Sequence, residues 1–125
     1  MTADHILGAL DYIDYILEAL NRMFDYMDDI EETEFLKDTL VQDAVLRNLA
    51  IVGHATHELA RFHPEFVAEQ PEIAWDTLYS LDQYMTHHYF NVDLKMLWHR
   101  IEQDLPIIGE QIQEIKEAAA ISDSV

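Results

Sequence analysis

The sequence predicts an all-α protein, built as an up-and-down bundle of four to five helices. Half of its 125 residues are hydrophobic, and only three glycines and three prolines interrupt the chain. Apolar residues recur in steps of three and four over long stretches, which places them on one face of a helix. No segment has the alternating pattern of a strand, so antiparallel helices joined by short loops are expected.

The first helix is expected over residues 3 to 29, with Thr2 as its N-cap. Its apolar stripe comprises Ile6, Leu7, Leu10, Ile13, Ile16, Leu17, Leu20, Met23, Phe24 and Met27. The acidic segment that follows, DDIEETE at residues 28 to 34, is expected to form a solvated turn.

The second helix is expected from about Phe35 to Phe62. Its apolar repeat comprises Leu36, Leu40, Val45, Leu49, Val52 and Leu59. Gly53 lies inside this helix, where glycine costs about 1 kcal/mol relative to alanine. Its presence predicts that another helix approaches closely at that point.

The second half of the chain is expected to hold two further long helices. Residues 63 to 75 contain two prolines and predict a break with one short helical turn. A third helix is expected from Trp75 to His87 and a last one over residues 94 to 119, capped by Asn91 or Asp93. Pro106 predicts a kink or a break in the last helix. One domain is expected over residues 1 to 120, followed by a frayed tail at 121 to 125.

The charge and composition exclude several kinds of protein. The sequence has seven basic and 25 acidic residues, which give a net charge of −18, and it has no cysteine. Disulfides and thiolate metal sites are therefore excluded, and long-range repulsion of polyanions disfavours unaided nucleic-acid binding. The chain shows neither a signal-peptide pattern nor an apolar run of membrane-spanning length. A soluble cytoplasmic protein without a membrane partner is expected, with a surface that suits a basic partner.

Histidines and aromatic residues gather in LDQYMTHHYFNVD, residues 81 to 93. His87 and His88 are adjacent there, and Tyr84 and Tyr89 flank them. Histidine can accept or return a proton near neutral pH. The two imidazoles and the Asp82 carboxylate are also chemically adequate for zinc or nickel. Because no HxxxH or ExxH pair supports such a site, neither a metal nor a cofactor is predicted.

Three segments together carry a resemblance to a known family. They are AVLRNLAIVGHATHEL (44 to 59), HPEFVAEQPEIAW (63 to 75) and HHYFNVDLKMLWHRIEQDLP (87 to 106). With the amphipathic first helix, the chain resembles HepT-like toxins of the HEPN superfamily, the toxin half of bacterial HEPN/MNT toxin–antitoxin modules. The resemblance implies an HEPN-like helical homodimer that cleaves RNA, tRNA among the candidates, without a metal.

The resemblance also implies roles for individual residues. The family motif is an arginine, then a histidine after four to six residues, then a tyrosine two places later. It makes His87 the catalytic base or acid and Tyr89 the acceptor of adenylyl groups from an MNT-type nucleotidyltransferase antitoxin. The arginine position is occupied by Asp82, whose carboxylate repels phosphate instead of holding it.

Two functions therefore stay open. One is a ribonuclease toxin controlled by adenylylation, with His88, Arg47 and Asn48 in supporting roles. The other is a catalytically degenerate HEPN protein that binds a nucleotidyltransferase partner or a nucleotide and cleaves nothing. Arg47 and His54 have the arginine-to-histidine spacing as well, but they lie in the segment that the resemblance assigns to helix packing.

Overall fold

The computed structural model describes residues 7–123, and every regular element within that range is a helix. The four long helices are α1 (Ala9–Asp28), α3 (Thr39–Phe62), α5 (Trp75–His87) and α6 (Leu94–Asp123). The connections hold two short helices, α2 (Glu32–Phe35) and α4 (Pro64–Ala68). The predicted all-α architecture is confirmed. No helix within the described range is long and apolar enough to cross a membrane.

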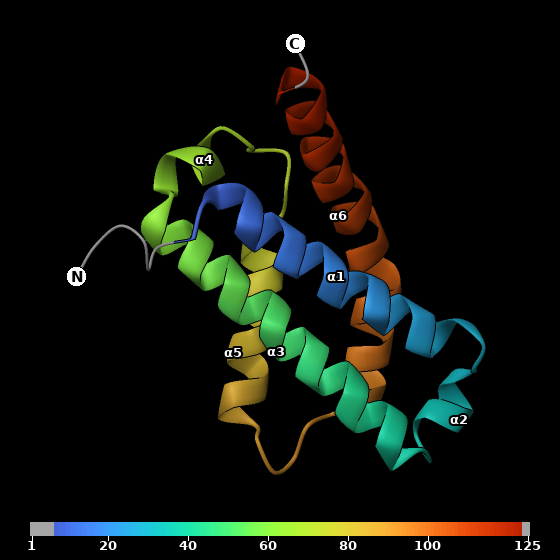
Figure 1. Ribbon diagram of the computed structural model, residues 1–125. Coiled ribbons are helices and arrows are strands. Elements are labelled where there is room, and N and C mark those ends of the chain that lie inside the picture. Colours follow the sequence, from blue (N-terminus) through green and yellow to red (C-terminus); the bar gives the residue numbers. More distant parts are fainter. Residues whose placement is uncertain (1–6, 124–125) are drawn as a thin grey trace.

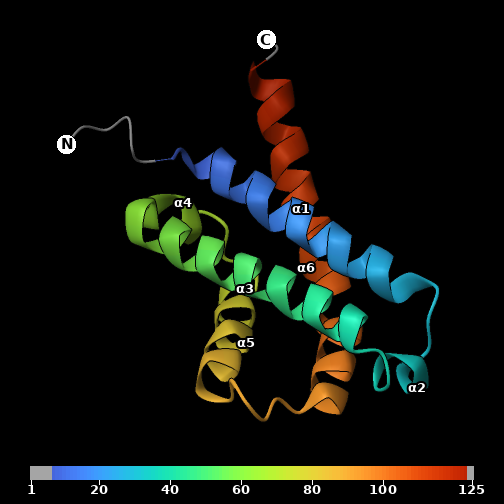
Figure 2. The ribbon, with the colours of Figure 1, turned by 60° about the horizontal axis from the view of Figure 1, so that its bottom comes forward.

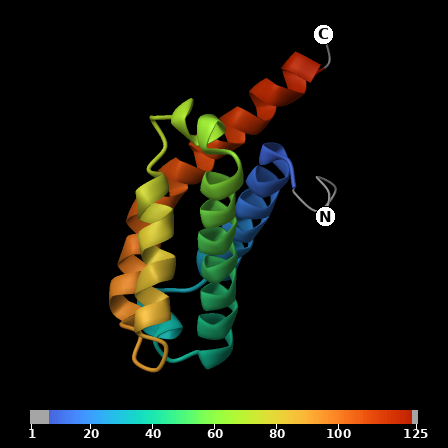
Figure 3. The ribbon, with the colours of Figure 1, turned by 90° about the vertical axis from the view of Figure 1, so that its left-hand side faces the viewer.

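The helices form two crossed layers. The α1 and α3 helices run antiparallel in one layer, and α5 and α6 run in opposite directions in the other (Figure 1). Views from below and from the side show the same two layers (Figures 2 and 3). Between the layers, α3 packs on α5 and α1 packs on α6. The up-and-down order predicted from the apolar periodicity is therefore present.

The apolar stripes of the long helices meet in one core. The largest side chains with no exposed surface include Ile13, Ile16, Leu20, Met23, Leu49, Leu59, Leu78, Leu97, Ile101, Leu105 and Ile112. Burial of each such side chain stabilises the fold by about 1.5–3 kcal/mol before entropy is counted. This shared burial holds the two layers together and sets which faces of α3 and α5 meet.

The first helix begins later than the sequence predicts. Gly8 has extended backbone angles and precedes the helix, and its N–H donates to Asp11 Oδ2 at 3.0 Å. The first helix therefore starts at Ala9, and the Asp11 carboxylate provides the Gly8 N–H with a hydrogen-bond acceptor at the start of the first turn. The predicted cap, Thr2, lies outside the described residues.

The acidic connector is more than the solvated turn that the sequence predicts. Residues Glu32–Phe35 form α2, and Phe35 is fully buried with its ring centroid 5.1 Å from that of Trp98. The long helix consequently starts at Thr39 instead of Phe35, and Asp38 Oδ1 accepts the Val41 N–H at 3.1 Å. A tertiary contact with α6 thus decides the local structure here.

The last helix is capped by Asp93, whose Oδ1 accepts the Met96 N–H at 3.0 Å. Of the two predicted caps, Asp93 is therefore the one used. The helix continues through Pro106 and changes direction between its orange first half and its red second half (Figure 3). It runs to Asp123, beyond the predicted boundary at residue 120. Residues 124 and 125 of the predicted tail lie outside the described range.

Candidate functional site

The site begins where α5 crosses α3 at Gly53. A Cβ atom added to Gly53 would lie 2.0 Å from the Cβ and 2.5 Å from the Cγ of Asp82. Since real Cβ contacts are never that short, only glycine allows this approach. The predicted close packing at Gly53 is confirmed, and its partner is the residue at the arginine position of the family motif.

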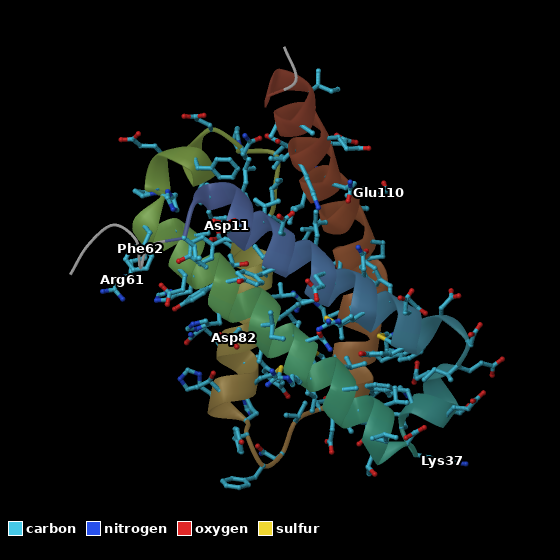
Figure 4. The ribbon with its side chains drawn as sticks, viewed as in Figure 1. Asp11, Lys37, Arg61, Phe62, Asp82 and Glu110 are labelled. Atoms are coloured by element: carbon cyan, nitrogen blue, oxygen red, sulfur yellow. The ribbon has the colours of Figure 1, made fainter. Side chains whose placement is uncertain are left out.

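Asp82 faces two imidazoles of α3. Partial burial raises the pKa of the Asp82 carboxyl, while the neighbouring His54 and His57 act in the opposite direction and lower it. Figure 4 shows Asp82 where α5 passes behind α3. The ring of His57 also stacks on Tyr79 of α5, with centroids 5.5 Å apart and an interplanar angle of 20°.

This cluster of Asp82, His54 and His57 is the part of the site that sequence reasoning missed. In the sequence, His54 lies in the segment that the resemblance assigns to helix packing. The distance of His54 and His57 from Asp82 along the chain hides their proximity to it. The only available signal was Gly53, which marks the face of α3 that meets another helix. Knowing that α5 is the other helix requires the fold.

His87 lies one and a half turns beyond Asp82, at the last position of α5. Its side chain is exposed, and its Nδ1 lies 2.8 Å from the Gln83 carbonyl oxygen. Because a carbonyl only accepts, Nδ1 carries a proton in this bond. In the neutral ring Nε2 then carries the free lone pair. This atom has no hydrogen-bond partner within residues 7–123. This is the arrangement that a general base requires.

His88 and Tyr84 order the turn that follows. The two rings stack with centroids 4.3 Å apart, and the Tyr84 hydroxyl oxygen accepts the Asp93 N–H at 3.0 Å. The N–H of His88 closes α5 on the carbonyl oxygen of Tyr84 at 3.0 Å. His88, predicted as a supporting residue, is therefore half-buried against Tyr84 and connects the end of α5 to the start of α6.

Tyr89 and Phe90 project from this turn into solvent. Tyr89 is 79% exposed and Phe90 is 96% exposed, and their rings touch edge to face. Together the two rings form a small patch of aromatic surface at the end of α5. The phenol of Tyr89 is consequently open to a modifying enzyme, as the sequence-based assignment requires.

The two supporting residues on α3 lie on different faces. Arg47 is exposed and lines a groove between α1 and α3. Asn48 is 5% exposed, and its Nδ2 donates to the Ala44 carbonyl oxygen at 2.9 Å. Its Oδ1 has no hydrogen-bond partner among the described residues. Asn48 is thus an interior residue, whereas Arg47 is available to a ligand.

The arrangement as a whole places a free imidazole and an exposed phenol at one end of α5. Asp82 lies on the same helix, about 8 Å from His87 by helical rise, and its neighbours His54 and His57 belong to α3. Among residues 7–123, no three histidine, aspartate or glutamate side chains are grouped so that they could hold a metal ion. The chemistry that the His87 imidazole offers at this end of α5 is proton transfer.

The chain is similar to known proteins over most of its length. The family described as Ribonuclease HepT-like matches residues 16–115. A "Putative RNase" of Methanocaldococcus jannaschii is 31% identical over 100 residues, which cover 80% of each chain. A "Probable ribonuclease HepT" of Thermococcus cleftensis is 29% identical over 85% of this chain and 94% of that protein. No solved structure matches. By the extent of these matches, the chain belongs to the HepT-like ribonuclease family.

Proposed function

We propose that this protein is the ribonuclease toxin of a toxin–antitoxin pair, acting in the cytoplasm, and that His87 transfers the proton when RNA is cleaved. The observation that carries the proposal is the exposed His87 ring, whose Nδ1 is engaged by Gln83 while Nε2 is free. The family membership supports the reaction class. Transfer RNA is the first substrate to test.

The reaction needs little from the protein, because RNA supplies its own nucleophile. His87 Nε2 takes the proton of a 2′-hydroxyl, and the 2′-oxygen attacks the adjacent phosphorus. The bond from phosphorus to the 5′-oxygen breaks as water gives that oxygen a proton. General acid–base catalysis of this kind contributes about 10²–10⁴-fold. Because RNA supplies the nucleophile and the His87 imidazole activates it, cleavage is proposed to be metal-independent.

Asp82 favours a second candidate function. A guanidinium at this position would offset charge on the phosphate in the transition state, and a carboxylate does not. Asp82 is packed against the Gly53 backbone, so its side chain is held at the site. The second candidate is a degenerate HEPN protein that binds a nucleotidyltransferase or a nucleotide without cleaving RNA.

Cleavage of labelled tRNA in the presence of EDTA separates the two functions. For the ribonuclease we expect cleavage by the natural protein, an about 10²-fold or larger loss in His87→Ala, and a gain in Asp82→Arg. Activity that appears only in Asp82→Arg supports the degenerate protein. Cleavage by the His87→Ala variant at the natural rate rejects the assigned role of His87.

Tyr89 is proposed as the point of control. An MNT-type nucleotidyltransferase partner would transfer adenylyl groups to its phenol, and its 79% exposure makes the oxygen accessible. The added phosphate would place negative charge beside His87 and block the approach of RNA. We expect an adenylyl mass increase on the natural protein after incubation with this partner and ATP. The Tyr89→Phe variant keeps the ring and should show no increase.

The functional unit is proposed to be a homodimer. Phe90 is 96% exposed and adjoins Tyr89 at the end of the bundle that carries His87. A second copy would cover the Phe90 ring and bring two His87 side chains to a shared cleft. Light scattering should report the mass of two chains, and a Phe90→Ser substitution should lower it toward the monomer mass.

A further inference from the structure

The seven basic residues differ in whether they have carboxylate partners. Four form ion pairs: Arg22 with Glu18, Lys95 with Glu32, Arg100 with Asp104 and Lys116 with Asp14. Lys37, Arg47 and Arg61 have no carboxylate within ion-pair distance in the part of the chain that the structure describes. In a protein of net charge −18, unpaired cations mark the surface that repels an anion least.

Two of these three cations line the same groove. It lies between α1 and α3, has a volume of 740 Å³, and is lined by Arg47, His54 and Arg61 among others. Arg47, His54 and Arg61 follow one another at intervals of seven residues, which is two helical turns or about 10 Å. They therefore form one line along α3. The third cation, Lys37, lies at the opposite end of the molecule from Arg61 (Figure 4).

Arg61 is positioned by an aromatic ring instead of a carboxylate. Its guanidinium carbon lies 5.1 Å from the centroid of the Phe62 ring. Such a cation–π contact restrains the guanidinium without occupying its N–H donors. The donors stay available to a phosphate, which accepts two parallel hydrogen bonds from arginine.

Aromatic rings accompany these cations in the groove. Tyr15 is 49% exposed and Phe62 is 38% exposed, so both present ring surface to a ligand. Tyr12 lies deeper in the groove. Its burial raises the pKa of its phenol, and the Glu58 and Asp11 carboxylates raise this pKa further. Tyr12 is thus a neutral hydroxyl at physiological pH. Cations interleaved with exposed rings are the usual means of binding single-stranded nucleic acid.

Glu58 is the acidic side chain that lines this groove, and its partner is His54. Its Oε1 lies 3.4 Å from His54 Nε2, and its Oε2 is buried without a hydrogen-bond partner within residues 7–123. One carboxylate oxygen therefore lies next to His54 and the other is buried. The side chains that give this groove fixed positive charge are the two arginines.

We propose that the α1–α3 groove binds single-stranded RNA, with phosphates on Arg47 and Arg61 and bases stacked on Tyr15 and Phe62. The proposal rests on the proposed cleavage of RNA. His54 provides the link, because it lines the groove and also neighbours Asp82 on α5. A strand in the groove therefore leads toward the helix that ends in His87.

Binding is measured with a fluorescent 2′-O-methyl oligouridine, whose blocked 2′-oxygen prevents cleavage. We expect Arg47→Ala and Arg61→Ala each to raise Kd about tenfold, and Lys37→Ala to leave it unchanged. Each arginine removed should also lower the slope of log Kd against log salt by about 0.7. Tyr15→Ala should weaken binding, and Tyr15→Phe should restore it because the ring remains.

The same variants show which proposal fails. Equal Kd values for the two arginine variants and Lys37→Ala would overturn the groove assignment. Loss of dimer mass in the arginine variants with an unchanged Kd would assign the groove to a second copy and also overturn it. If tRNA is not cleaved but the arginine variants bind oligouridine weakly, proposed cleavage fails and the groove stands. If tRNA is cleaved and these variants bind normally, the groove fails alone.

Discussion

Asp82 is a residue at which packing and electrostatics compete. Its Cβ and Cγ lie against Gly53, and partial burial raises the pKa of its carboxyl despite the two nearby histidines. Ionisation in the folded protein is therefore less favourable than in the unfolded chain. The neutral Asp82 carboxyl contributes its full stabilisation to the folded protein at pH values below the ordinary aspartate pKa. This contribution is lost as the pH rises through the higher pKa that Asp82 has in the folded protein.

The first prediction concerns this pH dependence. Asp82→Asn should raise the free energy of unfolding at pH 7 by at most about 1 kcal/mol, since the side chain is partly exposed and screened. The gain should shrink as pH is lowered toward about 4, where the natural carboxyl becomes neutral. Urea unfolding at several pH values measures it. Asp43→Asn removes an equal charge from an exposed site of α3, and an equal gain there would contradict the prediction.

His87, to which the proposed function assigns proton transfer, is oriented by a single local contact. The Gln83 carbonyl orients the ring and selects the tautomer through Nδ1. The same helix supplies both groups, so this orientation survives in any assembly that leaves α5 intact. The sequence identified His87 through the family motif, whereas its tautomer follows from the position of the helix end.

At the scale of elements, the α3–α5 contact is the joint that assembles the site. The Cβ of the residue at position 82 sits where a Cβ at position 53 would have to be. An arginine at position 82, as in the family motif, would have its Cβ in the same place. Gly53 is therefore required by any side chain at position 82, whatever chemistry that side chain performs.

The second prediction tests this joint. Gly53→Ala should lower the free energy of unfolding by about 1–3 kcal/mol, because α5 must move away from α3. Gly109→Ala is the matched control, since its Cβ would meet Phe24 Cε2 at an ordinary 3.4 Å. There the higher helix propensity of alanine should leave stability unchanged or raise it by up to about 1 kcal/mol. Urea unfolding curves compare the two, and equal shifts would refute the role of Gly53.

For the whole molecule, the dominant property is its negative charge of −18. Repulsion among acidic side chains opposes the compact state. The four ion pairs of lysine and arginine are at the surface, where each is worth about 0–1 kcal/mol. When salt screens both effects, we expect the relief of repulsion to raise stability by more than the weakening of the ion pairs lowers it.

The third prediction follows from that balance. Raising sodium chloride from about 0.01 M to about 0.15 M shortens the screening length from about 30 Å to about 8 Å. The Tm measured by calorimetry at constant pH should therefore rise by a few degrees. A fall in Tm over this range would mean that the surface ion pairs dominate.

The fold was largely predictable from sequence because it rests on local patterns. The apolar period, the prolines and the capping aspartate Asp93 locate the four long helices in the chain. The start of α3 was not predictable, since Phe35 joins a short helix in order to pack on Trp98 of α6. A contact across the bundle outweighed the local continuation of the helix.

The sequence by itself determined the helical architecture and the family, and it led to the proposed roles of His87 and Tyr89, because these depend on local periodicity and on a contiguous motif. Only the tertiary structure decided that Asp82 meets Gly53 and neighbours His54 and His57, and that Arg47 and Arg61 line one groove. Those relations depend on which helix faces are buried against each other. The total burial of many distant side chains sets that choice, and no local segment of the chain contains it.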